Sequence, residues 1–314
     1  MGSSASASLS SSSAPSAATL HRSLWLGALG VLMFAMTLPM TRLAVGPADA
    51  PQLPPLFVTA GRAAGAGLLA AVYLLLTRAA RPQQRHLRDL LVTALGSVVG
   101  FPLFLGLALR QVPSMHAAVV TGILPLATAA MAALMLRQRA PLGFWLCASA
   151  GCALVLVFAA WEGHGQLVLA DGWLLLAVLS ASVAYVSGAR LSAGWQAEQV
   201  ISWVLVLSLP VTLPVAALSW PTHAVSAAAW GGFAYVTVFS MWVGFFAWYR
   251  ALAMGGTLRV SQVQLLQPFL ALLLAVPVLG EALSPHTLGF ALAVLAVVML
   301  GKRMPVAAKK AGAA

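Results

Sequence analysis

Residues 262–283 read QVQLLQPFLALLLAVPVLGEAL, an apolar segment that opens with three glutamines, Gln262, Gln264 and Gln267, followed by Pro268. About 20 mainly apolar residues are enough to cross a membrane as one helix. Lipid cannot satisfy the hydrogen bonds of an amide side chain, so deep glutamines must face the inside of a helix bundle or a wet cavity. The segment therefore predicts a transmembrane helix with one polar face directed at its neighbours.

The whole chain shares this composition. Of its 314 residues, 61% are hydrophobic and 7% are charged, and the mean hydropathy is +0.95. Soluble domains carry about 25% charged residues, so this chain cannot cover a water-facing surface. We expect an all-α polytopic membrane protein whose outer solvent is the lipid bilayer. The net charge of +11 does not indicate a nucleic-acid partner, because the basic residues lie between apolar segments instead of forming one stripe.

Ten apolar segments are candidates for transmembrane helices. Residues 1–22 ahead of them are rich in serine and alanine and are expected to form a disordered N-terminal tail, and residues 304–314 a basic C-terminal tail. The ten predicted spans are residues 24–44, 56–77, 90–109, 114–136, 141–160, 172–190, 199–218, 230–250, 257–280 and 286–301.

The distribution of lysine and arginine predicts the orientation of these spans. Ten spans place both termini on the same side of the membrane. With cytoplasmic termini, 14 of the 17 basic residues face the cytoplasm, Arg42 and Arg110 face the outside, and Arg62 lies within a span. Because cytoplasmic loops are enriched in Lys and Arg, we expect a multi-pass protein with both termini in the cytoplasm.

The two halves of the chain resemble each other. A shift of 143 residues aligns ALRQVPSMHAAVVTGILPL (108–126) with ALAMGGTLRVSQVQLLQPF (251–269) and so matches Pro125 with Pro268. A shift of 148 aligns a tryptophan and an arginine near the start of each half: Trp25 with Trp173, and Arg42 with Arg190.

These matches predict two five-helix repeats, residues 23–160 and 171–303. Five is an odd number, so the second repeat enters the membrane from the opposite side. Inverted-topology repeats are typical of secondary transporters that bind a substrate near the bilayer midplane and expose it to each side in turn.

Three stretches carry a resemblance to a known family: WYRAL (248–252), LLQPFLALLLAVPVLGEALSPHTLGFALAVLAVVML (265–300) and TGILPLATAAMAALMLRQRAPLGFWLCASAG (121–151). They are similar to EamA-type transporters of the drug/metabolite transporter superfamily. In the first half, Arg137-Gln138 stands where that family usually has Gly-Glu. The resemblance covers nearly the whole chain and implies ten helices, a location in the bacterial inner membrane and export of small metabolites, without indicating a substrate.

Two proline-containing helices carry the polar faces that would flank a central site. At 100° per residue, four positions of 257–280, the last at Pro268, fall within about a third of the helix circumference, whereas Gln262 and Arg259 point elsewhere. The matching positions of 114–136 form a similar face. For the glutamines, plain hydrogen bonding between helices is the alternative to cavity lining. The candidate substrate-binding residues on these two helices are Ser261, Gln264, Gln267 and Pro268, and Thr121, Pro125 and Thr128.

Other spans add four substrate-binding candidates and one proton-linked candidate. Arg62 would be costly in lipid, so it either snorkels to the surface or faces the cavity and pairs with a substrate carboxylate. Trp242 and Tyr185 are expected in the cavity wall, and Thr37 offers a hydroxyl near mid-membrane. His116 can titrate near neutral pH, and is either linked to a proton or an interfacial histidine bonded to a carbonyl.

These patterns predict a secondary transporter that exports a small polar metabolite, an amino acid or related compound, by alternating access. The alternatives are a multidrug exporter and, from another class, a non-transporting membrane scaffold or an intramembrane enzyme. No cofactor or metal site is expected, because the chain lacks a P-loop and its six histidines are scattered. No carboxylate lies at mid-span, and Glu281 is expected to order the loop after its helix. Export or import, the coupling ion and the oligomeric state, a homodimer included, stay open.

Overall fold

The computed structural model describes residues 17–303 except 138–139, 164, 193–194 and 256–260. In this part of the chain, eight helices are long and apolar enough to cross a membrane, and two shorter apolar helices follow them. These ten segments correspond one by one to the ten predicted spans. They are His21–Val45, Pro55–Leu76, Gln84–Leu109, Ser114–Met135, Leu142–Glu162, Leu169–Leu191, Glu198–Leu218, Ala227–Trp248, Val263–Leu279 and Pro285–Gly301.

Several spans are built from more than one helical piece. The first, third, fourth, eighth and ninth spans are divided, whereas the others are single helices. In the first half the pieces are α1 (Ala17–Ala35), α2 (Thr37–Val45), α3 (Pro55–Leu76), α4 (Leu87–Ala94), η2 (Leu95–Gly100), α5 (Phe101–Leu109), α6 (Ser114–Thr121), α7 (Leu124–Met135) and α8 (Leu142–Glu162). In the second half they are α9 (Leu169–Ser192), α10 (Ala197–Leu218), α11 (Ala227–Tyr235), η3 (Val236–Val243), α12 (Gly244–Gly255), η4 (Ser261–Leu266), α14 (Gln267–Leu279) and α15 (Pro285–Lys302).

The interruptions recur at matching places in the two halves. The third span contains a π-helical segment, η2, and the eighth span contains another, η3. The fourth span changes direction between α6 and α7, and the ninth changes from the 3₁₀ helix η4 to α14. π-Helical segments and short 3₁₀ stretches inside long helices are frequently found at functional sites. The two halves are therefore similar in where their helices are interrupted as well as in sequence.

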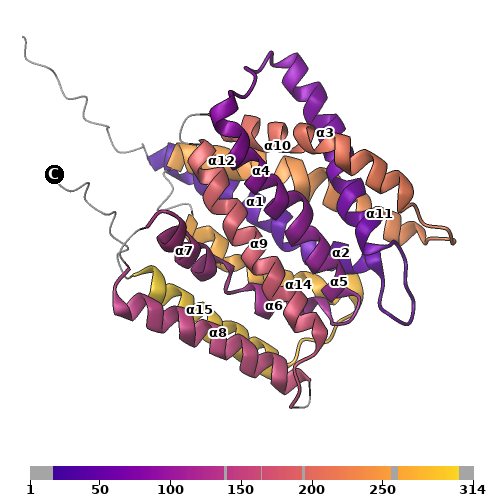
Figure 1. Cartoon of the computed structure of the whole chain (residues 1–314). Helices are drawn as coiled ribbons and strands as arrows, with labels where there is room; N and C mark the ends of the chain where they lie inside the picture. Colours follow the sequence, from indigo (N-terminus) through magenta and orange to yellow (C-terminus); the bar gives the residue numbers. More distant parts are fainter. Residues whose placement is uncertain (1–16, 138–139, 164, 193–194, 256–260, 304–314) are drawn as a thin grey trace, which may run out of the picture.

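Packing between the halves follows the same plan. The second span packs against the seventh (α3 on α10), and the fifth against the tenth (α8 on α15, side by side in Figure 1). The first span packs on the eighth and ninth, and correspondingly the sixth packs on the third and fourth. Each of these contacts between spans therefore has a counterpart between the equivalent spans of the other half. The bundle is an all-α fold of two inverted-topology five-helix repeats.

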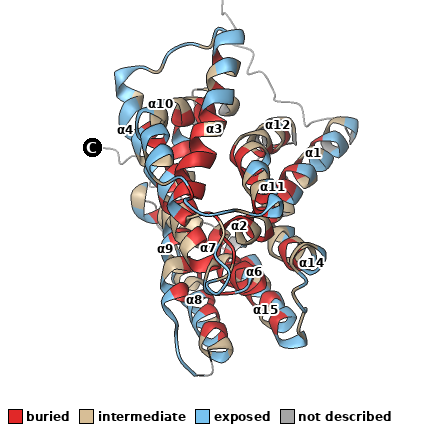
Figure 2. Cartoon of the chain, turned by 90° about the vertical axis from the view of Figure 1, so that its right-hand side faces the viewer, coloured by how far each residue is buried: buried red, intermediate tan, exposed pale blue. Residues whose placement is uncertain are grey.

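The interior of this bundle is tightly packed where glycines replace larger side chains. Figure 2 shows buried residues along the inner sides of the helices and exposed residues along the outer sides. A Cβ placed on Gly96 would lie 2.4 Å from the carbonyl oxygen of Ser180 on α9. At Gly96 only a glycine lets these two backbones approach so closely, and a Cβ on Gly100 would likewise lie 2.6 Å from the side chain of Ser180.

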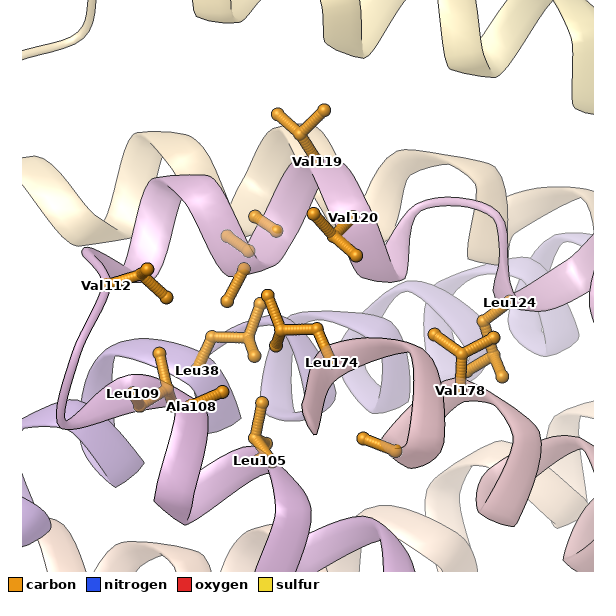
Figure 3. Close-up of a cluster of buried hydrophobic side chains, with 14 of the residues drawn as sticks. Leu38, Leu105, Ala108, Leu109, Val112, Val119, Val120, Leu124, Leu174 and Val178 are labelled. Carbon is orange, nitrogen blue, oxygen red and sulfur yellow. The ribbon is translucent and has the colours of Figure 1, made fainter. Parts of the chain in front are cut away.

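An apolar cluster fills the bundle where α2, α5, α6, α7 and α9 meet (Figure 3). Leu38, Leu105, Leu109 and Leu174 are among its members, and each is at most 7% exposed. These side chains converge from both halves of the chain and fix the first span against the third, fourth and sixth. The cluster therefore forms a solid wall next to the cavity described below.

Candidate functional site

A cavity lies between the two halves, close to the middle of the spans that line it. It encloses about 910 Å³ of empty space, its open mouth included. The first four spans supply one part of its wall, and the sixth, eighth and ninth supply the other. Eight of the eleven predicted substrate-binding residues line it: Thr37, Arg62, Thr121, Pro125, Tyr185, Gln264, Gln267 and Pro268.

The two interrupted spans place their polar residues at this cavity because their helices break there. Pro125 and Pro268 each lie in the first turn of the piece after the break, α7 and α14. Proline lacks a backbone N–H and is tolerated at this position, where the preceding backbone is not held by a full helical hydrogen-bond ladder. Thr121 ends α6, and its hydroxyl donates to the carbonyl of Ala117 at 2.7 Å.

The glutamines of the ninth span lie directly at its break. Gln264 belongs to the 3₁₀ helix η4, and Gln267 is the first residue of α14. Both side chains are half-buried, both line the cavity, and among the described residues neither amide forms a hydrogen bond. An amide offers two donors and one acceptor oxygen. The ninth span therefore presents unused donors and acceptors to whatever occupies the cavity.

A short polar network crosses the cavity from the first half to the second. The hydroxyls of Thr37 and Ser240 lie 2.8 Å apart, and the Nη2 of Arg62 donates to the Ser240 hydroxyl at 3.0 Å. All three side chains are buried, with exposed fractions between 2% and 6%. Three spans, the first, second and eighth, are thus joined by side chains that line the same cavity.

Sequence reasoning did not identify two of the serines that line the cavity, Ser97 and Ser240. They lie in the π-helical segments η2 and η3 and are related by the same shift of 143 residues that matches Pro125 with Pro268. This shift is the signal that could have found them. Under the other shift, of 148 residues, Thr37 corresponds to Tyr185. The cavity is therefore lined by equivalent positions of the two repeats.

The remaining predicted residues lie away from this cavity. Trp242 donates through Nε1 to the hydroxyl of Ser202 at 3.3 Å and packs on Tyr73 and Phe246. Its ring is turned toward α3 and α10 because these helices offer both aromatic contact and a hydrogen-bond acceptor. Thr128 is half-buried on α7 outside the lining, with no hydrogen-bond partner for its hydroxyl in the described part of the chain. The side chain of Ser261 is outside the described residues.

His116 also lies outside the cavity lining and is paired with an acid. Its Nε2 and the Oδ1 of Asp171 are 2.7 Å apart, and both side chains are 5% exposed. The other carboxylate oxygen of Asp171 accepts from the backbone N–H of Val168 at 2.9 Å. The expected alternative, an interfacial histidine bonded to a carbonyl, does not describe this contact. His116 instead ties the start of α6 to the start of α9.

The same end of the bundle is held by Glu281. Its two carboxylate oxygens accept from the backbone N–H groups of Ser114 and Met115 at 2.7 and 2.8 Å. These N–H groups open α6, and a carboxylate at a helix N-terminus satisfies free donors and the positive end of the helix dipole. Glu281 lies in the connection after its own helix, and these bonds fix that loop to the fourth span. The contact is possible because α14 packs on α6 and brings the two together.

We call this end of the molecule, where the α5–α6, α8–α9 and α14–α15 connections lie, the Glu281 end. Two further contacts cross it: Arg42 donates to the carbonyl of Leu109, and His286 pairs with Glu162 at 2.9 Å. At the opposite end, Arg190 and Asp89 approach to 3.7 Å, with the arginine side chain 51% exposed. Among the residues that the structure describes, polar links between spans are more numerous at the Glu281 end, and the link between His116 and Asp171 is buried.

The side chains that line the cavity are suited to binding a polar molecule. No group of three His, Cys, Asp or Glu side chains that could hold a metal ion occurs among the residues searched, those that the structure describes. The cavity offers one guanidinium, several hydroxyls, two amides and aromatic rings. A few such polar groups in a mostly apolar pocket fix the orientation of a bound small molecule.

Comparison with known proteins agrees with this architecture. The chain is similar to an uncharacterized transporter, YdeK, of Bacillus subtilis (strain 168), with 44% identity over 279 residues that cover 88% of this chain and 96% of that protein. A solved crystal structure that is 18% identical covers 89% of this chain and 98% of its own, with a TM-score of 0.59, and so has the same fold. The EamA-like transporter family matches twice, at residues 21–160 and 168–301. The chain is therefore a multi-pass membrane protein that belongs to the EamA-like transporter family.

Proposed function

We propose that this protein is a secondary transporter that exports a small polar metabolite, an amino acid or a related compound, and that it is not an enzyme. The observation that carries this proposal is the mid-span cavity lined by equivalent residues of both repeats. A small substrate needs a mostly apolar pocket with a few placed polar groups. The amides of Gln264 and Gln267 and the hydroxyls of Thr37 and Ser240 supply those groups.

Alternating access is supported by the difference between the two ends of the bundle. The buried contact of His116 and the partly buried contacts of Glu281 and Arg42 hold the Glu281 end together. A second conformation, in which the opposite end closes and these contacts open, follows from the inverted repeat, because each half can adopt the arrangement of the other. We propose that the structure represents the conformation that is closed at the Glu281 end.

The bias of basic residues extends the proposal to location. With both termini in the cytoplasm, the Glu281 end faces outward, and a cavity closed at that end would load its substrate from the cytoplasm, as an exporter requires. We therefore place the protein in the bacterial inner membrane. This orientation is tested by labelling a cysteine introduced at Asp49, in the connection after α2, with a membrane-impermeant reagent in intact cells. Labelling only after lysis would overturn it.

The first test is metabolite profiling of cells and medium. We compare cells expressing the native chain with cells expressing Gln267→Leu, which keeps side-chain bulk and removes the amide. A metabolite that accumulates outside only with the native chain identifies the substrate class. The matched control is Gln111→Leu, since Gln111 is exposed at the end of the third span and lies outside the cavity lining. This control should export as the native chain does.

Two outcomes would contradict the proposal. Equal profiles for the native chain and the Gln267→Leu variant under every feeding condition would show that the glutamine face only packs helices. Accumulation of a compound inside cells would show import, which uses the same inverted architecture. A membrane scaffold without transport predicts the first of these outcomes and an unchanged growth phenotype.

A multidrug exporter is the second candidate, and the aromatic wall of the cavity favours it. Phe34, Phe101, Tyr185 and Phe245 line the cavity beside its polar groups. Broad apolar and aromatic surfaces accept many lipophilic molecules. Expression would then raise resistance to chemically unrelated toxic compounds, whereas a metabolite exporter would protect only against an excess of its own substrate class.

A further inference from the structure

Arg62 is an unusual residue to find inside this bundle. It is the eighth residue of α3 (Pro55–Leu76), about 10 Å along the helix from its start at 1.5 Å per residue. It is 2% exposed and lines the cavity. A charged side chain at this depth faces a bundle interior or a wet cavity and marks a substrate or ion pathway in most cases. Snorkelling, the alternative suggested by the sequence, does not occur.

The guanidinium group has more donors than the protein uses. Its Nη2 donates to the Ser240 hydroxyl at 3.0 Å. Its Nε and Nη1 are buried and have no hydrogen-bond partner in the described part of the chain. Guanidinium N–H groups left unpaired in a low-dielectric site are unfavourable unless an acceptor comes from outside the chain.

The protein also provides no counter-ion for this charge. The chain has six acidic residues, and the structure describes all of them. Four already have partners elsewhere, and the other two lie in the exposed connection after α2 and in the first turn of α10. The four partnered acids are Asp89 with Arg190, Glu162 with His286, Asp171 with His116, and Glu281 with the N–H groups of α6.

We infer that the cavity binds its substrate through a single carboxylate group that pairs with Arg62 and accepts from one hydroxyl of the Thr37–Ser240 pair, the one whose proton is not donated to the other. This inference rests on the proposed transport function and names its substrate class. Arg62 is the only Lys or Arg among the described residues that line the cavity, so the site neutralises one negative charge. A monoanionic carboxylate therefore fits better than a phosphate dianion or a cation.

The rest of the cavity determines which carboxylates fit. The amides of Gln264 and Gln267 and the phenol of Tyr185 lie on spans of the second half, whereas Arg62 is in the first. They can donate hydrogen bonds to, or accept them from, the rest of the substrate, such as an amino group. The cavity thus offers one cationic group, Arg62, together with uncharged amides and a phenol. This arrangement selects against the lipophilic cations that many multidrug exporters carry.

The test measures binding and transport separately on the purified full-length protein. The probes are matched pairs with one skeleton, amino acids and 2-oxo acids against their carboxamides, together with inorganic phosphate. Binding is measured as the rise in melting temperature with ligand. Transport is measured as flux from vesicles of purely zwitterionic lipid, which removes anionic headgroups as a competing source of negative charge. The variants are Arg62→Gln and Arg62→Lys, with Arg88→Gln, at an exposed position of α4, as the matched control.

The native protein and Arg88→Gln should prefer a carboxylate over its carboxamide by about tenfold or more, because the carboxamide leaves Arg62 without its counter-ion. Arg62→Gln should lose this preference while its carboxamide binding changes little, and Arg62→Lys should keep part of it. Without ligand, Arg62→Gln should melt no lower than the native protein, because an unneutralised buried charge is removed. A large drop in its melting temperature would instead indicate a structural role and overturn the inference.

The outcomes separate this inference from the proposed function. Flux without any carboxylate preference, or a stronger effect of phosphate than of carboxylates, would overturn the role of Arg62 and leave export standing. Arg62-dependent binding of carboxylates without flux would support the role of Arg62 and overturn transport. Neither binding nor flux for any probe would overturn both.

Discussion

The two repeats have the same arrangement of helices but differ in the residues that follow the fourth and ninth spans. At the end of the ninth span, Gly280 adopts a left-handed conformation (φ 68°) and Glu281 follows it to bind the first N–H groups of α6. The matching place in the first half is Arg137-Gln138, and Arg137 is also left-handed, with φ 50°. Both halves therefore have a left-handed residue at this position, whereas only the second half has a carboxylate, that of Glu281, after it. Residue 138 is outside the described residues.

Because the repeats are inverted, a difference between the halves becomes a difference between the two ends of the bundle. The second half contributes both acids that hold the Glu281 end, Asp171 and Glu281. Position 23, which matches Asp171 at a shift of 148 residues, is a serine, and position 138 is a glutamine. The opposite end thus lacks these two acids. If the contacts that close one end of the bundle are stronger than those that close the other, the protein without substrate would favour the conformation closed at the stronger end.

The largest effect is expected at Asp171. In Asp171→Ala, the buried His116 and the N–H of Val168 lose their hydrogen-bond acceptor, and each polar group left buried without a partner costs about 1–3 kcal/mol. The matched control is Asp89→Ala at the opposite end, where the partner Arg190 is half-exposed and the pair contributes about 0–1 kcal/mol. Melting of the two purified variants measures this difference. Equal losses would contradict the view that the ends are closed with unequal strength.

A smaller loss is expected for Glu281→Ala, because two helix N–H groups lose their acceptor, a change that costs about 1–2 kcal/mol. Its more specific effect should be on access to the cavity. We would replace Cys147 and Cys152 with alanine, introduce Thr121→Cys in the cavity wall, and add a membrane-impermeant thiol reagent at the Glu281 side.

In that background, Glu281→Ala should speed labelling of the cavity cysteine from the Glu281 side. Glu198→Ala, which removes an acid from the first turn of α10 at the other end, is the control and should leave this rate unchanged. An unaltered labelling rate in Glu281→Ala would mean that Glu281 caps a helix without contributing to closure.

The smallest effects concern the shared left-handed turn. A left-handed residue with a side chain costs about 1–2 kcal/mol relative to glycine. Gly280→Ala should therefore destabilise the protein by about 1 kcal/mol through backbone strain alone, since no atom lies within 4 Å of the added Cβ. Arg137→Gly should stabilise it by a similar amount. Chemical denaturation in mild detergent tests both, and a loss of stability in Arg137→Gly would show that the arginine side chain makes a favourable contact.

The difference between the halves also shapes the cavity. Gln264 and Gln267 correspond to Thr121 and Leu124 at a shift of 143 residues, so the second half supplies amides where the first supplies a hydroxyl and an apolar group. The first half supplies the arginine, whose counterpart at a shift of 148 is Pro210. One repeated framework thus contributes chemically different side chains from its two halves to a single cavity.

Much of this architecture is determined by the sequence alone. The ten spans, the two repeats and the polar face of residues 262–283 follow from local composition, because a helix in lipid must be apolar along its whole length and every exception needs a reason. Eight cavity-lining residues, Gln264, Gln267 and Arg62 among them, could be predicted for this reason.

Tertiary structure decided what composition cannot encode. Lipid is as apolar as a bundle interior, so the hydrophobic pattern of a span does not show which side faces the core. The direction of Trp242 toward α3 and α10, and the inclusion of Ser97 and Ser240 in the cavity, depend on which helices become neighbours. The pairing of His116 with Asp171 joins residues 55 positions apart. Such contacts are set only when the two repeats pack against each other, because each partner comes from a different span.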